Sequence, residues 1–451
     1  MKINFSYWGA MVSQIPLASA PSRALYATRT RAYVPLFMRM HSIGMHRAAS
    51  RRDDHLGDSM TDHDHSIRTR LVQRSRPKAG ERRPVNVPVY RASTVLFEDM
   101  ADMSASDAEL AKRQRSFNYG THGNPTTFAL EDMITDLEGG YRTRLSGSGL
   151  AAIGFGLMPF LRPGDHCLFT EATYGPVIKR FAKVFLERWG VSYDRYKADG
   201  SDIESRFKPN TKLVFAEVPG SQAFELLDLR ALAAKTKPRG IILAVDNTWG
   251  SGYLYQPLKL GADVSIIAAT KHIAGHSDLL LGAVTTTQDT WAPIHDMHEA
   301  FGINVSGDDA YLALRGARTM AVRLPVHQAT TMKICEWAST RPEVANILWP
   351  AWPSHPGHDI WKRDFKGACG LFSLEFKAPK EKIDKFVDSL VCFQLGSSWG
   401  GYESLVNDTN VPATRTVTDW SRRGIIVRFH AGLEDPADLI RDLEQGLRHL
   451  A

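Results

Sequence analysis

Short apolar segments alternate with helical ones through the middle of the chain, and this alternation constrains the fold more than any other feature. The apolar segments are rich in β-branched residues and read as strands: 166–170 (HCLFT), 212–218 (KLVFAEV), 240–249 (GIILAVDNTW) and 262–270 (ADVSIIAAT). Between them, 176–189 and 228–237 have the apolar spacing of helices. Such an alternation is typical of a mostly parallel sheet covered on both faces. We therefore expect an α/β fold.

The flanking sequence predicts four regions. We expect a basic extension at 1–59, a polar, extended arm at 60–125, a large domain at 126–310 and a smaller α+β domain at 311–451. The last region opens with one long helical stretch, 309–340, before further strand-like segments. The pattern predicts a small domain that closes over the large one.

Positive charge is concentrated at the N-terminal end. Residues 1–52 contain eight Lys and Arg residues and no Asp or Glu. Without those eight, 47 basic residues face 49 acidic ones, so no basic stripe remains for a nucleic acid, and we expect no such partner. The extension is either a disordered, over-extended start, with Met60 as the true start and a cytoplasmic location, or an organellar presequence.

Membrane spans and metal sites are not indicated. No run approaches the roughly 18 apolar residues of a spanning helix. The four cysteines lie far apart without the spacing of metal ligands, which favours buried free thiols in a reducing compartment. We expect neither a membrane partner nor a metal.

Polar residues follow the predicted strands where open α/β sheets bind ligands. A Gly/Ser turn at 146–152 (SGSGLAA) leads into a helix, whose N-terminus suits a phosphate. Asp246 lies at the end of one strand and Lys271 just past another. Asp246 could pair with a pyridine nitrogen, and Lys271 could form an imine and then act as a base. Together they predict a pyridoxal 5'-phosphate (PLP) site, although each alone fits a turn, a helix cap or a surface lysine.

Seven motifs occur in order from about residue 85 to the C-terminus: YGTHGNPTTFALE, SGSGLAA, EATYGP, AVDNTWGSG, DVSIIAATKHIAGHSD, SSWGGYESL and VRFHAGLED. The chain resembles the Cys/Met-metabolism family of fold-type I PLP-dependent enzymes. The resemblance implies a PLP-dependent transferase-like fold, with a large domain around a mostly parallel sheet and a smaller C-terminal domain.

The resemblance also implies roles for individual residues. Lys271 would bind PLP covalently and act as the catalytic base, Asp246 would pair with the ring nitrogen, and Tyr174 would stack on the ring and assist proton transfer. The phosphate would be bound by Ser148, Gly149, Leu150 and Thr270, and by Tyr119 of a neighbouring subunit. Arg428 would bind the substrate carboxylate in a pocket that Ser398 and Trp399 also line. A shared site implies a homodimer at least, and relatives are commonly tetramers.

Two positions depart from the family pattern. The family usually has an arginine two residues after the tyrosine, where this chain has Thr121, followed by His122. Ala268 also replaces a common serine. We expect weaker phosphate binding unless His122 or Arg115 compensates.

Two local features favour β-elimination within the family. Trp399 stands where γ-type members generally have a smaller residue, and 217–226 (EVPGSQAFEL) is similar to the form found in β-eliminating members. The expected substrate is a sulfur amino acid, L-cystathionine, cleaved to homocysteine, pyruvate and ammonia in methionine biosynthesis. A γ-lyase or γ-synthase and a catalytically silent paralogue remain alternatives, and Trp399 could instead be core packing.

Overall fold

The computed structural model describes residues 65–76, 82 and 84–450. The predicted basic extension therefore lies outside the described residues. Within the part that the structure describes, no helix is long and apolar enough to cross a membrane.

A seven-stranded sheet forms the larger part of the fold, in the order β1-β7-β6-β5-β4-β2-β3. The strands from β3 to β6 in this order pair in parallel, whereas β7 runs antiparallel between β6 and β1. This mostly parallel sheet confirms the predicted fold class. The strands are β1 (Arg142–Ser146), β2 (His166–Thr170), β3 (Ser192–Tyr196), β4 (Thr211–Glu217), β5 (Ile242–Asp246), β6 (Val264–Ala268) and β7 (Gly282–Thr286).

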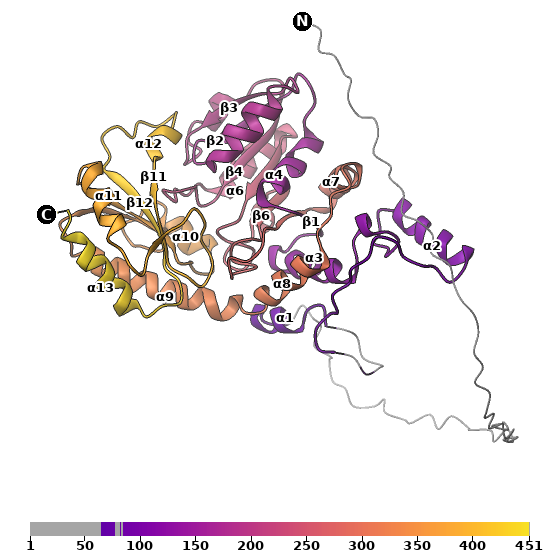
Figure 1. The fold of residues 1–451 in the computed structure, drawn as a ribbon. Helices are drawn as coiled ribbons and strands as arrows, with labels where there is room; N and C mark the ends of the chain where they lie inside the picture. The colour runs from indigo at the N-terminus through magenta and orange to yellow at the C-terminus, as the bar shows by residue number, and fades with distance from the viewer. Residues whose placement is uncertain (1–64, 77–81, 83, 451) are drawn as a thin grey trace, which may run out of the picture. The chain divides into compact units, whose positions relative to one another are not determined.

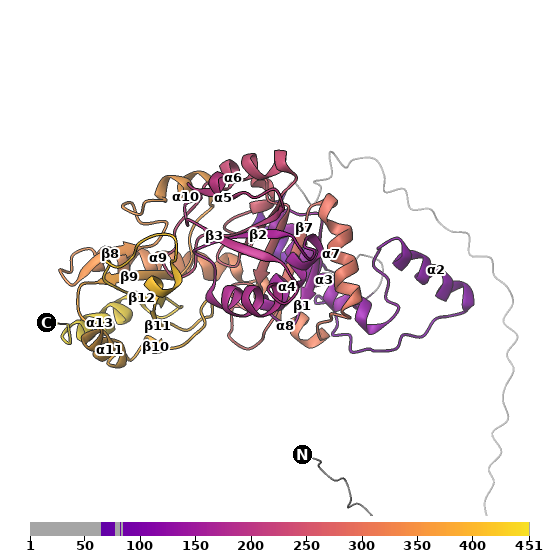
Figure 2. The same ribbon diagram turned by 90° about the horizontal axis from the view of Figure 1, so that it is seen from above.

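Successive residues of the central strands pack into two different cores. Leu168 and Val214 belong to the core that includes α3 and α6, while Phe169 and Phe215 face α4 and η3. Figure 2 shows α5 and α6 on one side of the strands and α4 on the other. The helices are α3 (Pro125–Glu138), α4 (Gly149–Leu157), the π-helical η3 (Val177–Leu186), α5 (Ile203–Arg206), α6 (Leu229–Thr236) and α7 (Gln288–Ala300). The sheet is thus covered on both faces, as near-continuous apolar strands require.

A second, five-stranded sheet follows in the order β10-β11-β12-β9-β8 and is mainly antiparallel. Figure 1 shows this orange and yellow part beside the magenta strands of the larger sheet. Its strands are β8 (Val344–Leu348), β9 (Leu371–Phe376), β10 (Gln394–Leu395), β11 (Leu405–Thr409) and β12 (Ile425–His430). Its helices are α9 (Met320–Ala338), α10 (His358–Asp364), α11 (Lys380–Asp388), α12 (Val411–Thr414) and α13 (Pro436–Leu447).

The structure differs from the sequence-based expectations in three places. The long helical stretch is divided into α8 (Gly307–Ala317) and α9, because the chain leaves helical geometry at Thr319. The segment expected to be extended contains α1 (Ile67–Gln73) and α2 (Met100–Ala111). Strands β1, β3 and β7 were not predicted, because their sequences (RTRLS, SYDRY and GAVTT) lack a long apolar run.

Candidate active site

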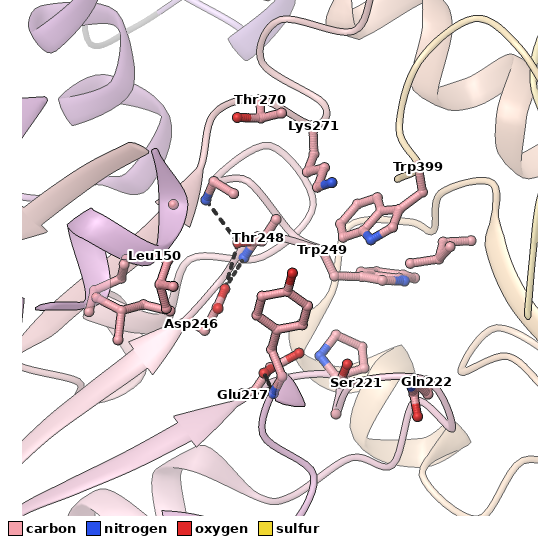
Figure 3. Close-up of a pocket in the computed structure, with 18 of the residues that line it drawn as sticks. Leu150, Glu217, Ser221, Gln222, Asp246, Thr248, Trp249, Thr270, Lys271 and Trp399 are labelled. Atoms are coloured by element: carbon pink, nitrogen blue, oxygen red, sulfur yellow. Dashed lines mark hydrogen bonds between the residues drawn. The ribbon is translucent and has the colours of Figure 1, made fainter. Parts of the chain in front are cut away.

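A pocket lies where β4, β5 and β6 end, beside the first turn of α4. Glu217 and Asp246 close two of these strands and are direct partners in the sheet. The small sheet completes the pocket through Leu371 of β9 and Arg428 of β12. Figure 3 shows Asp246, Lys271 and Trp399 around this space. The topology therefore brings most of the predicted site residues together at the expected edge of the sheet.

Lys271 follows β6 and is largely buried. Its Nζ donates a hydrogen bond to Ser398 Oγ at 2.6 Å and lies 5.4 Å from the centre of the Trp399 indole. Burial, helped by the charge of Arg428, lowers the pKa of Lys271 to about 8, while Asp246 opposes the shift. More of this amine is neutral near neutral pH than of an ordinary lysine, as a nucleophile or base requires.

Asp246 is buried at the end of β5. Its Oδ1 accepts hydrogen bonds from the backbone N–H of Thr248 at 2.9 Å and from the Thr248 hydroxyl at 2.6 Å. Burial raises the pKa of Asp246, and the bonds from Thr248 oppose that rise. Among the described residues, no donor reaches Oδ2. A cationic N–H in the pocket would supply the missing partner and favour the charged carboxylate.

The Gly/Ser turn begins α4 as predicted. Ser148 caps the helix by accepting a hydrogen bond from Ala151 N–H at 3.2 Å. Gly149 packs so closely on β6 that a Cβ at this position would lie 2.6 Å from the Cβ of Ala268. The backbone N–H groups of Gly149 and Leu150 lie in the first turn, where a helix has no internal acceptors, and both residues line the pocket. This end of the pocket could hold an anion.

Thr270 lines the pocket, but its hydroxyl already has partners. It accepts a hydrogen bond from Leu281 N–H at 2.9 Å and donates one to the Leu281 carbonyl at 3.2 Å. A hydroxyl carries one proton. In this arrangement Thr270 can therefore accept a further bond but has no proton for a phosphate.

Arg428 forms the opposite end of the pocket. Its Nη2 donates to the carbonyls of Ser398 at 3.2 Å and Gly396 at 3.4 Å, and it has no ion pair with any described residue. Burial lowers the pKa of Arg428 to about 10, so it stays cationic at neutral pH. Trp399 lines the same end and meets the His272 ring edge-on at 5.2 Å. A partly buried arginine without an anionic partner among the described residues suits a carboxylate ligand.

Tyr174 lines the pocket, and its backbone N–H donates to Glu217 Oε2 at 2.6 Å. Burial, together with the Glu217 charge, raises the pKa of Tyr174. Sequence reasoning placed 212–218 in a strand but assigned no role to Glu217. Its partly buried carboxyl lies beside Asp246, and desolvation first, then Asp246, raises its pKa well above the usual range. The signal was available, because Glu217 ends its strand as Asp246 ends the next.

Thr248 was also missed. Besides binding Asp246, its hydroxyl accepts a hydrogen bond from Ala268 N–H at 2.9 Å, which ties β5 to β6. It follows Asp246 by two residues. At this spacing an aspartate side chain commonly accepts a hydrogen bond from the backbone N–H of the later residue. That spacing could have identified it.

Among the predicted site residues, Ser398 does not line this pocket itself but contacts Lys271, and Tyr119 is not part of the pocket. Tyr119 is 47% exposed and precedes the short helix η1 (Gly120–His122). Neither proposed substitute for the missing arginine is free. His122 Nδ1 lies 2.6 Å from Glu299 Oε2, and Arg115 pairs with Glu131 at 3.0 Å and with Asp132. Within the part of the chain that the structure describes, no arginine thus lies at the α4 end of the pocket.

The pocket matches PLP in the chemistry of its groups. A partly buried amine with a lowered pKa, a buried carboxylate with a free oxygen and the N-terminus of a helix could hold an aldehyde, a pyridine nitrogen and a phosphate, respectively. Arg428 would remain for a substrate carboxylate.

Comparisons with known proteins agree with this assignment. The model of the Cys/Met metabolism PLP-dependent enzymes matches residues 68–448. Cystathionine beta-lyase of Bordetella avium is 44% identical over 370 residues, 82% of this chain and 93% of that protein. Cystathionine gamma-synthase of Mycobacterium bovis is 35% identical over 372 residues, 80% and 92% of the two chains.

A solved structure shows the same fold. The crystal structure of metB from Corynebacterium glutamicum aligns with a TM-score of 0.79 and 32% identity, covering 87% of this chain and 100% of that one. With the family match over nearly all the described residues, the chain belongs to the Cys/Met metabolism PLP-dependent enzymes.

Proposed function

We propose that this protein is a carbon–sulfur β-lyase that cleaves L-cystathionine, with the uptake of one water, to homocysteine, pyruvate and ammonia. The observation that carries the proposal is the position of Trp399, whose indole lies 5.4 Å from Lys271 Nζ, at the end of the pocket occupied by Arg428. A bulky ring there limits the room beside the reacting carbons. The 44% identity to a protein named cystathionine beta-lyase supports the same choice.

The proposed cofactor contacts use this chain's own groups. Lys271 would hold the PLP aldehyde, Asp246 the ring nitrogen, and the first turn of α4 with Ser148 the phosphate. Tyr174 would lie against the ring. When bound, PLP supplies an electron sink that stabilises negative charge at the substrate Cα.

Arg428 and Lys271 would perform the central steps. Arg428 binds the substrate carboxylate through two parallel N–H groups, which fixes the Cα–H bond relative to Lys271. Lys271, whose lowered pKa makes the neutral amine more available than in an ordinary lysine, takes the Cα proton. Either Lys271 or Tyr174 then gives a proton to the departing sulfur.

Ser398 has a positioning role in this scheme. Its hydroxyl accepts a hydrogen bond from Lys271 Nζ, and its carbonyl accepts one from Arg428. One residue thereby connects the base to the carboxylate-binding group. We expect both side chains to shift together if the 396–399 loop moves.

The competing activity is γ-elimination or γ-replacement, which the 35% identity to a gamma-synthase keeps as the second candidate. A catalytically silent paralogue is disfavoured because Lys271, Asp246, Tyr174 and Arg428 all line one pocket. We further infer a homodimer at least, and by resemblance a tetramer, since Tyr119 lies outside its own pocket. The cytoplasm is the proposed location, with an organelle as the alternative if 1–52 is a presequence.

The test is to incubate the purified protein with PLP and L-cystathionine and to identify the keto acid by mass spectrometry. We expect pyruvate. The variant Lys271→Ala should be at least ~10³-fold slower, because both the imine-forming amine and the base are removed. Formation of 2-oxobutyrate would favour the γ-lyase, and no keto acid with a fully PLP-loaded protein would overturn the lyase proposal.

A further inference from the structure

Two loops form one wall of the pocket, and the structure joins them. One loop, 171–174, follows β2 and ends at Tyr174, and the other, 219–225, follows β4. The N–H of Ser221 donates to the carbonyl of Ala172 at 2.7 Å. A displacement of either loop would therefore strain this hydrogen bond and tend to displace the other loop.

The 219–225 loop adopts a conformation that needs outside support. Gln222 has φ 71° and Phe224 has φ 57°, both in the left-handed region that residues other than glycine disfavour. Such residues cost about 1–3 kcal/mol each and persist where surrounding contacts hold them. Figure 3 shows Ser221 and Gln222 of this loop at the pocket. The contacts that hold the loop therefore also set the shape of the pocket wall.

Arg415 makes several of those contacts. It lies between α12 and β12, and its side chain is only 1% exposed. Its Nε and Nη2 donate to the two carboxylate oxygens of Glu225 at 2.6 and 2.7 Å. Nη2 also donates to the Ser221 carbonyl at 2.7 Å, and Nη1 donates to the Glu171 carbonyl at 3.2 Å. One guanidinium from the small-sheet part of the chain thus binds both loops.

Glu171 makes the reciprocal connection. Its Oε2 accepts hydrogen bonds from the N–H groups of Val417 at 2.8 Å and Thr418 at 2.9 Å, and its Oε1 accepts one from the Thr418 hydroxyl. The segment 415–418 therefore holds the pocket wall through donors at Arg415 and at Val417 and Thr418. We call this set of contacts the 415–418 clamp.

We propose that Arg415 is a positioning residue for the reaction, which fixes the loops carrying Tyr174 and Gln222 against the segment that precedes β12. The inference rests on the proposed function of this pocket. Arginine suits the role because its planar fork can serve one carboxylate and two carbonyls at once. Lysine has a single nitrogen and cannot satisfy all three acceptors in this geometry.

Arg423 offers a matched control. Like Arg415, it lies between α12 and β12, and its Nη1 pairs with Glu375 at 3.0 Å. Both arginines lie over the Trp420 ring, at 5.8 Å for Arg415 and 4.9 Å for Arg423. Arg423 has no hydrogen bond to either loop. Replacing it removes an arginine–glutamate pair of the small-sheet part without releasing the pocket wall.

The first experiment compares Arg415→Gln, Arg415→Lys and Arg423→Gln as PLP-loaded proteins acting on L-cystathionine. We expect Arg415→Gln to lower kcat at least ~10-fold, because small displacements of reacting groups are costly. KM should change by less than about threefold, since no contact joins Arg415 to Arg428, the group expected to bind the substrate carboxylate. Arg415→Lys should recover only part of kcat, and Arg423→Gln should retain it within about twofold.

A second measurement separates the clamp from the reaction. In amide hydrogen exchange of the protein without substrate, peptides covering 171–174 and 219–225 should exchange faster in Arg415→Gln than in wild type and be unchanged in Arg423→Gln. If the wild type proves to have another activity, this result still tests the clamp. If Arg415→Gln fails to fold, Thr418→Val, which removes one hydroxyl contact, replaces it. Unchanged exchange and kcat in the foldable variant, or equal losses in Arg423→Gln, would overturn the proposal.

Discussion

The two ends of the pocket are built differently. At the carboxylate end, Arg428 is partly buried, cationic and without an anionic partner among the described residues, and Ser398 holds it beside Lys271. At the α4 end, the chain offers backbone N–H groups and the Ser148 hydroxyl. Lys271 and Arg428 are the only cationic side chains among the described residues that line the pocket.

This difference indicates how much of each binding site one chain can build. A carboxylate would find a full positive charge within the chain, whereas a phosphate would find dipoles and a hydroxyl. Arg115 and His122 do not correct the imbalance, because they pair with acidic residues of their own chain. We therefore expect the α4 end to need a second copy of the chain, with Tyr119 as the contributed residue.

Replacing Arg428 by lysine should have the largest effect of the predictions that follow. The change keeps the charge but loses the bidentate geometry, so we expect kcat/KM for L-cystathionine to fall by about 100-fold. The visible absorbance of lysine-bound PLP should remain. Arg423→Lys is the control and should change kcat/KM by less than about twofold. Normal catalysis by Arg428→Lys would show that the carboxylate end does not bind the substrate as described.

Buried imidazoles beside the carboxylate end predict a pH effect on stability. His430 follows Arg428 on β12, and its ring lies 5.2 Å from that of His327. Burial, reinforced by neighbouring positive groups, lowers the pKa of His327 to about 2, and burial lowers the pKa of His430 to about 4. Both rings are thus neutral in the folded protein but take up protons below about pH 6.5 when it unfolds. Their contribution to the free energy of unfolding is complete above that pH and is lost as the pH falls toward 4.

At pH 5, each histidine should therefore lower the free energy of unfolding by about 2 kcal/mol relative to pH 7.5. Glu138 acts in the opposite sense, because burial raises its pKa to about 7. The measurement is thus a comparison of urea denaturation for wild type and His327→Gln at both pH values. The variant should lose less stability on acidification than wild type. Equal losses would contradict the buried neutral state of His327.

Adding a positive charge at the α4 end should strengthen PLP binding. This gain should be smaller than the losses predicted above. If Thr121 occupies the usual position of the phosphate-binding arginine, Thr121→Arg should tighten PLP binding by about tenfold, because a charge-assisted hydrogen bond contributes about 1.5–3 kcal/mol. Equilibrium titration of the PLP-free protein would measure the Kd. Thr121→Gln, which adds length without charge, should leave the Kd within about twofold. Equal PLP affinities for wild type and Thr121→Arg would contradict the expectation that a positive charge is missing at this end.

Sequence patterns were most informative where one property dominated a whole segment. All of 166–170 and most of 212–218 are buried, so their apolar character identified β2 and β4 within one residue at each end. Asp246 and Lys271 were found because one is a polar residue at the end of such a run and the other follows one. The same reasoning applied to Glu217, but without the strand order it could not be placed next to Asp246.

The features that sequence patterns missed depend on contacts distant in the chain. Strand β3 lies at the sheet edge and is mostly not buried, so its sequence carries little apolar signal. In α2 only Ser106 is buried, which leaves no apolar stripe to detect. The 415–418 clamp joins residues about 190 to 250 positions apart, so no local sequence pattern predicts it.

The expectation that the α4 end needs Tyr119 of a second copy is tested most directly by mixing two defective variants. Lys271→Ala lacks the base but retains Tyr119, and Tyr119→Ala retains Lys271 but lacks the residue expected to reach the neighbour's phosphate. In a randomly reassociated dimer, one hybrid site combines both intact residues, so a 1:1 mixture should recover about a quarter of wild-type activity after unfolding and refolding together. Activity no greater than the mean of the separately refolded variants would contradict the account, because Tyr119 would then not complete the pocket of another chain.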